Sequence, residues 1–526
     1  MLVYPYHVST GYIGYLDKRA RKIEEERLVN EKRKQAGVAF PAAGDQEHLL
    51  IIRFNISDHV LEDIEKGKKN IRDGLKNLCR FIEYALNGKK KVDSLSEDGS
   101  IEFKTVSDFK FSFTIGFGVG FFEKLRIDKG NRPCKLTAMP DYSALGDVAP
   151  YNLQQTDFII QIGSNQDYLN SWLFQNTTGT IKHNKQKTPL YGARTETKAF
   201  EDEDVVPDIY TAIKNWANIT DFHSGFQRID GKNLLGFNDG ISNPFRLSND
   251  VIWTTRTDEP EKFRDGTYMV FQKIEHDLEK WRGMDEEKQE MWMGRSKYTG
   301  LLLGTLSKEN DRKLASNMRS DNRIVRDRAI KEWKYYYNKQ KDPSTKFFDG
   351  SQIQYKNIQI ECPVWSHVRK ANPREADGEA KRLIFRRGYL YSEGGSSSRM
   401  SSGLLFICFQ RDIKNGFEYI KRNFLNNKNF PVPEKRKFKS TELRQRQSQG
   451  RFMMKELQNL NRGDHTNLSM DPDSLNTGKD GLSGPSELGV YPHGQFPVTK
   501  TLGGGYYFIP PIPRKKISEI GEQFFD

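Results

Sequence analysis

Short runs of hydrophobic residues, with polar stretches between them, predict strands alternating with helices. Residues 48–57 and 157–163 are rich in β-branched and other apolar residues, and residues 107–116 alternate apolar with polar, so all three are expected to be strands. Residues 58–86 place apolar side chains at mostly three- and four-residue steps, which predicts an amphipathic helix. A further helix is expected over residues 165–175. The order strand, helix, strand, strand, helix is that of a ferredoxin-like α+β unit.

A similar order recurs in the second half of the chain. Strands are expected at residues 267–274, 403–410 and 504–509, and helices at residues 277–293 and 416–425. We therefore predict an α+β fold with two ferredoxin-like domains and antiparallel sheets. The N-terminal domain is expected over residues 47–230 and the C-terminal domain over residues 231–526.

Three stretches do not fit this pattern. Residues 1–46 indicate a charged N-terminal extension. Residues 304–357 are charged and helix-prone, and residues 431–499 are rich in polar residues, Gly and Pro, which favours a long surface excursion. We expect the last two to be insertions that mediate oligomer contacts, cover the functional site or serve neither purpose.

Composition narrows the class of protein. No stretch approaches the roughly 18 uninterrupted apolar residues of a membrane span, and the N-terminus lacks a basic start followed by an apolar run. We therefore expect a soluble, cytoplasmic protein that is not bound to a membrane. The net charge of +13 could indicate binding to nucleic acid, but the basic residues are interspersed with acidic ones, which is typical of a solvated helix face. We therefore expect no binding to nucleic acid. The four cysteines are widely spaced, which argues against a disulfide framework or a zinc site.

Two segments carry candidate chemistry. The first contains Gly236-Phe-Asn-Asp-Gly240, and the second contains His367 and, further on, Arg386. Each residue has an ordinary alternative, because Asp before Gly is usually a turn residue, a lone His is usually structural and a lone Arg is usually solvated. The surrounding sequences change that assessment. They read Leu234-Leu-Gly-Phe-Asn-Asp-Gly-Ile-Ser-Asn-Pro244 and Glu361-Cys-Pro-Val-Trp-Ser-His-Val-Arg-Lys-Ala-Asn-Pro-Arg374.

These two segments resemble the signatures of the dye-decolorizing peroxidases. The resemblance extends over about residues 48–515 and is greatest to the longer members of that family. It implies that the two domains combine as a dimeric α+β barrel and that the C-terminal domain holds most of one haem b per chain. It also implies an axial iron ligand, His367. Other cofactor contacts implied by the motifs are Gly240, Ile241, Ser242, Arg295, Arg369, Asn372, Pro373 and Arg374, with arginine suited to a haem propionate.

The resemblance assigns the peroxide chemistry to Asp239 and Arg386. Asp239 would move a proton between the two peroxide oxygens, and Arg386 would stabilise the negative charge that develops there. The reaction it implies reduces hydrogen peroxide to water through an oxoferryl porphyrin-radical intermediate, which then oxidises bulky organic donors such as dyes and phenolics in one-electron steps. A carboxylate stays a competent base in acid, so turnover is expected to peak at acidic pH.

Some expectations remain open from sequence alone. Asp412, at the end of a predicted strand, is a candidate partner for the outer nitrogen of His367. Candidate electron carriers near the motifs are Trp365, Tyr389 and Tyr391. The chain departs from the family pattern just after Arg386, where Tyr389-Leu-Tyr-Ser392 lacks the usual Pro and Gly, so the shape of the access channel is in doubt. Alternative functions are a haem-handling protein with incidental peroxidase activity and a catalytically silent structural module. The protein could also form a homo-oligomer.

Overall fold

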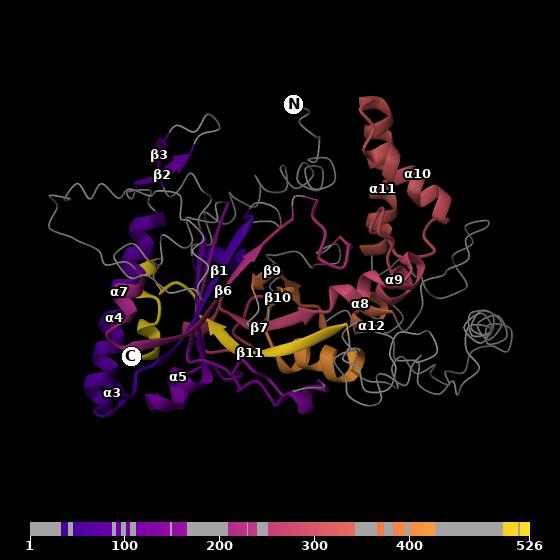
Figure 1. The fold of residues 1–526 in the computed structure, drawn as a ribbon. Coiled ribbons are helices and arrows are strands. Elements are labelled where there is room, and N and C mark those ends of the chain that lie inside the picture. Colours follow the sequence, from indigo (N-terminus) through magenta and orange to yellow (C-terminus); the bar gives the residue numbers. More distant parts are fainter. Residues whose placement is uncertain are drawn as a thin grey trace.

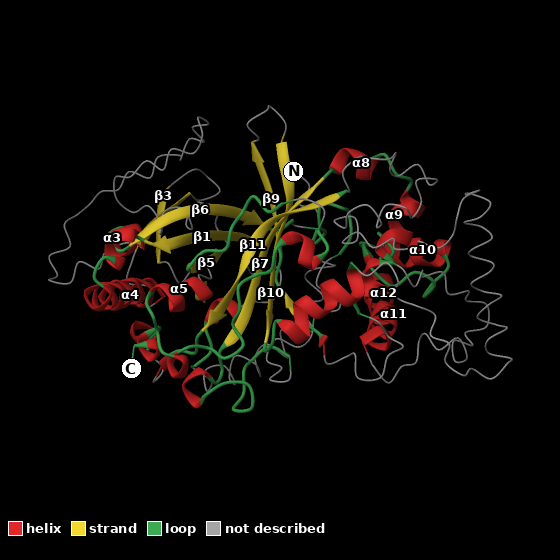
Figure 2. Cartoon of the chain, turned by 90° about the horizontal axis from the view of Figure 1, so that it is seen from below, coloured by secondary structure: helices red, strands yellow, loops and turns green. Residues whose placement is uncertain are grey.

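The strands of the chain close into an antiparallel barrel in the computed structural model (Figures 1 and 2). Nine of the described strands follow the order β7-β11-β4-β5-β1-β6-β9-β10-β8, and β7 also pairs with β10, which closes the sheet. The structure describes residues 33–39, 46–86, 91–95, 101–105, 112–147, 150–165, 209–228, 230–238, 243, 251–341, 366–372, 382–394, 400–426, 498–513 and 516–525.

The strand bounds show how the barrel divides into two halves. Its N-terminal half contains β1 (His48–Ile56), β4 (Ser112–Gly118), β5 (Phe158–Ser164) and β6 (Ala217–Phe226). Its C-terminal half contains β7 (Thr267–His276), the two-residue β8 (Phe385–Arg386), β9 (Tyr389–Gly394), β10 (Met400–Gln410) and β11 (Thr499–Ile509). A separate hairpin is formed by β2 (Lys91–Leu95) and β3 (Ile101–Thr105).

Both halves have the predicted ferredoxin-like strand order. Each places its first and third strands in the centre and its second and fourth at the edges, as β4-β5-β1-β6 and β9-β10-β7-β11. The halves join edge to edge, where Gly118 of β4 pairs with Tyr507 of β11 and Phe226 of β6 pairs with Leu390 of β9. The predicted antiparallel α+β fold is therefore confirmed, with the strands forming one closed sheet.

Helices cover the outer face of this barrel. The longest, α4, packs Ile71, Leu75 and Leu78 into one core cluster with Ile52 and Ile115 of the strands. The described α-helices are α2 (Ala36–Ala39), α3 (Asp58–Leu61), α4 (Ile64–Leu86), α5 (Val119–Lys124), α7 (Ile209–Ile213), α8 (Leu278–Arg282), α9 (Glu286–Met293), α10 (Lys308–Met318), α11 (Arg323–Lys341) and α12 (His367–Ala371). Two π-helical segments, η7 (Lys414–Glu418) and η8 (Ile420–Leu425), follow β10. No helix among the described residues is long and apolar enough to cross a membrane.

Most sequence-predicted elements lie where expected, with local differences. The single helix predicted for residues 58–86 is interrupted between α3 and α4, and the one predicted for residues 277–293 is divided at Gly283 into α8 and α9. The strands β2, β3, β6, β8 and β9 were not predicted. All but the first residue of the helix predicted for residues 165–175 lies outside the described residues, as does nearly all of the predicted insertion at residues 431–499.

The described part of the other predicted insertion, residues 304–341, contains a helical hairpin that projects from the barrel (Figure 1). Its helices α10 and α11 share a small core made by Leu301, Leu314, Ala329 and Trp333. The first described residues, 33–39, pack against the barrel, and the Gln35 side chain donates to the carbonyls of Ile115 and Pro510. The described cysteines, Cys79, Cys134 and Cys408, form no disulfide.

The barrel interior holds a cluster of ionisable side chains, which we name the interior charge cluster: Arg53, Asp221, His223, Lys273 and Glu393. Arg53 is fully buried and donates twice to the Asp221 carboxylate, at 2.7 and 2.6 Å. Lys273 Nζ lies 2.6 Å from Glu393 Oε2 and 3.4 Å from His223 Nδ1. The cluster connects the halves, because β1 and β6 belong to one and β7 and β9 to the other.

We expect this cluster to make the fold sensitive to acid. Burial alone would raise the pKa of Asp221, but hydrogen bonds from Arg53 and His223 outweigh it and hold the pKa well below its ordinary value. Burial also opposes the shift at Glu393, where bonds from His223 and Lys273 lower the pKa to about 2. Both carboxylates therefore stabilise the fold fully above their unfolded pKa of about 4, and this contribution is lost as pH falls through the folded values.

The Asp221→Asn variant tests this expectation by urea unfolding. At pH 7 it should lower the free energy of unfolding by about 3 kcal/mol, because Arg53 loses its charged partner while still buried. The difference from wild type should shrink as pH is lowered from 4 towards 2. A difference that stays constant over this range would show that Asp221 does not titrate with unfolding.

Candidate active site

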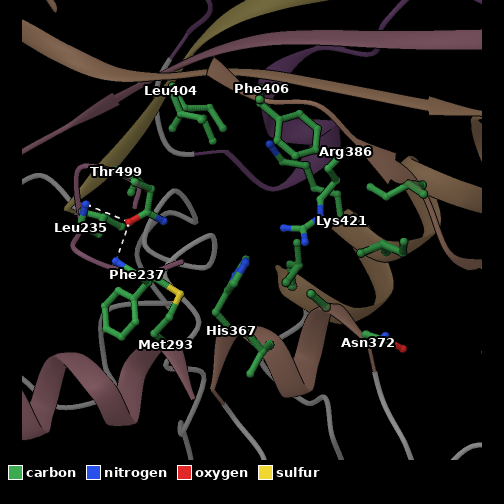
Figure 3. A pocket seen from close by; sticks show the side chains of 18 of the residues that line it. Leu235, Phe237, Met293, His367, Asn372, Arg386, Leu404, Phe406, Lys421 and Thr499 are labelled. Atoms are coloured by element: carbon green, nitrogen blue, oxygen red, sulfur yellow. Dashed lines mark hydrogen bonds between the residues drawn. The ribbon is translucent and has the colours of Figure 1, made fainter. Parts of the chain in front are cut away.

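A cavity lies between the barrel wall and the helices of the C-terminal half (Figure 3). It has about 1580 Å³ of space between atoms, part of it open to solvent, and its described lining residues fall between Asn233 and Thr499. Most of that lining is apolar, including Leu235, Phe237, Ile274, Met293, Leu404, Phe406, Phe417 and Ile420. Ten of the 24 described lining residues are polar, among them His367, Arg386 and Lys421.

His367 projects into the middle of the cavity from the first position of α12 (Figure 3). Its position depends on Gly294, which ends α9 with a φ of +83°. A Cβ at Gly294 would meet Ser366 Oγ at 2.3 Å and Val368 Cγ2 at 2.6 Å. Glycine is favoured at this position because it tolerates the left-handed backbone conformation and because it lets α9 approach the start of α12 closely. This contact brings His367 beside the segment that carries Met293 and Arg295.

Arg386 lines the same cavity from β8. Its backbone is held by Asn243, whose Nδ2 donates to the Arg386 carbonyl at 2.7 Å and whose Oδ1 accepts from the Arg386 amide at 3.2 Å. Asn243 belongs to the segment Leu234-Leu-Gly-Phe-Asn-Asp-Gly-Ile-Ser-Asn-Pro244. The two motif segments are thus joined directly at Arg386.

A buried ion pair forms part of the cavity wall next to Arg386. Lys421 of η8 lines the cavity, and its Nζ lies 3.0 Å from Asp147 Oδ1, with both side chains at most 5% exposed. The other Asp147 oxygen accepts a hydrogen bond from the Tyr151 hydroxyl at 2.6 Å. Lys421 also donates to Gln272 Oε1 at 3.3 Å. The wall of the C-terminal cavity therefore depends on a carboxylate from the N-terminal half.

Strand β7 contributes three lining residues at alternate positions: Gln272, Ile274 and His276. Burial lowers the pKa of His276 to about 4, so its imidazole is neutral at physiological pH. Asn233 also lines the cavity, and its Oδ1 accepts from the backbone amides of Leu235 and Phe237 (Figure 3).

Comparison with known proteins decides the family. The profile described as Dyp-type peroxidase, N-terminal, matches residues 56–185, and the one described as Dyp-type peroxidase, C-terminal, matches residues 230–431. Together they cover more than half of the chain. The protein belongs to the Dyp-type peroxidase family.

Individual relatives agree with this assignment over a smaller region. Deferrochelatases of Escherichia coli strain K12 and Shigella flexneri are each 33% identical over 196 residues, which is 36% of this chain and 37% of the relative. The match thus spans little more than a third of those proteins. A DyP-type peroxidase from Streptomyces coelicolor has the same fold, with a TM-score of 0.54 and 17% identity over 93% of this chain and 95% of its own.

The cavity fits the haem of Dyp-type peroxidases in its chemistry. A flat macrocycle needs apolar walls, the iron needs a neutral donor such as imidazole, and the propionates need cations. The apolar lining, His367 and the cations Arg295, Arg386 and Lys421 meet these needs. Arg295 is 5% exposed, and its Nη1 donates to the Gly300 carbonyl at 2.7 Å, which fixes the guanidinium at the cavity.

Only some of the residues predicted for this site are described. His367, Arg386, Arg295 and Asn372 line one cavity. The backbone of Arg369 lies in α12, but its side chain is outside the described part. Also outside the described residues are Asp239, Gly240, Ile241, Ser242, Trp365, Pro373 and Arg374.

The structure gives Asp412 a different role from the predicted one. Its Oδ2 lies 3.1 Å from Lys135 Nζ, and it accepts hydrogen bonds from the backbone and side chain of Asn415. Asp412 is absent from the described cavity lining. The prediction that it orients His367 is wrong, because the end of β10 directs it towards the N-terminal half. Tyr389 and Tyr391, predicted electron carriers, are both almost fully buried.

Sequence reasoning missed Gln272, His276, Lys421 and Asp147. A signal was present for the first two, because Gln272 and His276 lie two positions on either side of Ile274 and so share one face of the strand. No comparable signal marks the ion pair. Lys421 lies in a helix with other charged residues, and Asp147 lies in an irregular segment of the other half.

Proposed function

We propose that this protein is a haem b peroxidase that reduces hydrogen peroxide and oxidises an organic donor. The observation that carries the proposal is the meeting of His367 and Arg386 in one apolar cavity, where Asn243 ties Arg386 to the segment containing Asp239. Membership of the Dyp-type peroxidase family supports the same conclusion.

The cofactor would be held almost wholly by the C-terminal half, one per chain. His367 would bind the iron through a ring nitrogen, and the apolar lining would enclose the macrocycle. Arg295 is a candidate for a propionate contact, together with Arg369, Arg374 and the segment Gly240-Ile-Ser242. Asn372 and Pro373 follow α12 and would shape the same wall. Bound haem would supply the redox-active iron at which the oxygen–oxygen bond of peroxide is cleaved.

The protein's part in the reaction is to move protons and stabilise charge. Hydrogen peroxide takes up two electrons and two protons and gives two molecules of water. Asp239 would accept the proton from one peroxide oxygen and return it to the other, so that the second leaves as water. Arg386, which is permanently charged, would stabilise the peroxide anion and the negative charge on the departing oxygen.

The electron donor is proposed to be a bulky organic molecule such as a dye or phenolic compound, oxidised in two one-electron steps. The sequence after Arg386, Tyr389-Leu-Tyr-Ser392, forms β9 and is largely buried in the barrel. Access for the donor would therefore come from the helix side of the cavity.

The His367→Ala variant tests this function. Wild type reconstituted with haem should show a Soret band and consume peroxide in the presence of an organic donor. Loss of the iron ligand should reduce peroxide turnover by more than about 100-fold, since even a lost outer partner of a ligand costs about 10- to 100-fold in metal affinity or activity. His59→Ala, which alters a histidine on α3 bonded to the Asn215 carbonyl, is the matched control. Equal turnover in wild type and His367→Ala would contradict the proposal.

A second candidate function is the release of iron from haem. It is favoured by the matched relatives, which are named deferrochelatase. Haem that lost its iron would leave metal-free porphyrin, which can be followed by its fluorescence under reducing conditions. Porphyrin formation without peroxide consumption would favour this function over the peroxidase.

A further inference from the structure

Two nitrogen atoms on the β7 wall of the cavity are buried and have no hydrogen-bond partner among the described residues. They are Gln272 Nε2 and His276 Nδ1. Such unsatisfied groups are rare in folded proteins, and each costs free energy because it has lost water without gaining a partner. Two on one strand indicate a wall that is complete only when the cavity is filled.

The orientation of the Gln272 amide is fixed by its neighbour. Lys421 Nζ carries only donors, so it must face the amide oxygen, which it does at 3.3 Å. Lys421 is itself held by Asp147 at 3.0 Å and lies 3.5 Å from Thr501 Oγ1. The NH₂ group of Gln272 therefore cannot turn to exchange places with the oxygen.

The strands on either side offer the Gln272 amide no acceptor. Its cross-strand partner on β10 is Phe406, whose side chain is an aromatic ring, and its partner on β11 is Gly504, which has no side chain. Gln272 is 1% exposed, so bulk water does not satisfy the group either. An acceptor must come from the cavity itself.

The charge at this end of the cavity indicates what kind of acceptor fits. Phe406, Arg386 and Lys421 lie together on one side of His367 (Figure 3). Lys421 is already paired with Asp147, but Arg386 together with a fixed NH₂ donor favours an oxygen that carries negative charge. Haem carries such oxygens in its carboxylates, and peroxide carries one when deprotonated.

We propose that Gln272 contacts the molecule bound in the cavity, donating from Nε2 to an anionic oxygen of the haem or of peroxide. The inference rests on the proposed function for the identity of that molecule. Gln272 would then be a binding residue, because its NH₂ group has no hydrogen-bond acceptor among the described residues of the protein alone. This NH₂ group would gain an acceptor only when the cavity is occupied.

The test uses Gln272→Met, which keeps the length of the side chain and removes the unsatisfied donor. Without haem, its thermal midpoint should be no lower than that of wild type, because Lys421 keeps Asp147 and Thr501. Haem affinity, measured by Soret titration, should fall about tenfold, the size of one lost hydrogen bond to a charged group. Gln272→Glu, which presents a carboxylate in place of the donor, should lower it further. Thr501→Val, which alters a different neighbour of Lys421, should bind haem as wild type does.

The outcomes separate the two possible acceptors. A fall in haem affinity supports the haem carboxylate, whereas unchanged haem affinity with about a tenfold slower reaction with peroxide supports the peroxide oxygen. Wild-type values for both quantities in Gln272→Met and Gln272→Glu would overturn the inference and leave the peroxidase proposal intact. A wild-type protein that takes up no haem would overturn both.

Discussion

Replacing Asp239 by Ala is expected to slow the reaction of the haem-loaded protein with hydrogen peroxide by about 10²- to 10⁴-fold, the range of a lost general acid–base group. The reason is that peroxide bound next to Arg386 would still have its charge stabilised but would have no group to move its proton. Stopped-flow mixing of loaded wild type and variant with peroxide measures the rate directly. Haem occupancy should be unchanged, because the proposed iron ligand is His367 and not Asp239.

Two controls make this result specific. Asp285→Ala removes an aspartate from the exposed start of α9 and should react as wild type does. Wild type should also oxidise a bulky donor fastest in acid, since a carboxylate with a pKa near 3.9 remains ionised where a histidine is protonated. A rate that is flat from acid to neutral pH, or equal in wild type and Asp239→Ala, would remove Asp239 from the mechanism.

The largest loss of stability is expected from Lys421→Met. This change leaves the Asp147 carboxylate, whose side chain is 1% exposed, without its cation. Removing one partner of a buried ion pair costs about 3–5 kcal/mol, because the remaining charge stays away from water. The free energy of unfolding of the haem-free protein, measured by urea denaturation at pH 7, should fall by this amount.

The double variant Lys421→Met with Asp147→Asn distinguishes charge from packing. Neutralising the carboxylate removes the unpaired charge, and an amide can still accept from the Tyr151 hydroxyl. Most of the stability lost in Lys421→Met should therefore return. A double variant as unstable as the single one would mean that the methylene chain of Lys421, rather than its charge, supports the wall.

The two halves of the fold were predictable from the hydrophobic pattern of the sequence, whereas their closure into a barrel was implied only by the family resemblance. Runs such as residues 48–57 and 403–410 identify buried strands because burial leaves a local pattern in the sequence. The pairing of β4 with β11 and of β6 with β9 leaves no such pattern, because it joins edges that are distant along the chain. The strand β6 was missed for a related reason: Asn218, Asp221 and His223 interrupt its apolar pattern.

In the candidate site too, some residues were predictable from sequence and others were not. His367 and Arg386 were found because the residues around each resemble a known motif, and the cavity contains both. Lys421 and Asp147 were not found, because each is an ordinary charged residue until the fold places one against the other. Asp412 was misjudged because the end of a strand does not determine which neighbouring segment receives the side chain.

Strand β7 has a consequence for engineering the protein. It is paired on both sides, with Gln272 and Ile274 facing the cavity and Phe271 and Lys273 facing the barrel interior. A bulky or charged replacement on one side would shift the backbone and disturb the other, so the strand has little freedom to accept new residues. Variants that accept larger donors should therefore be sought on α12 and η8, where Val368, Ala371 and Ile420 line the cavity from elements outside the sheet.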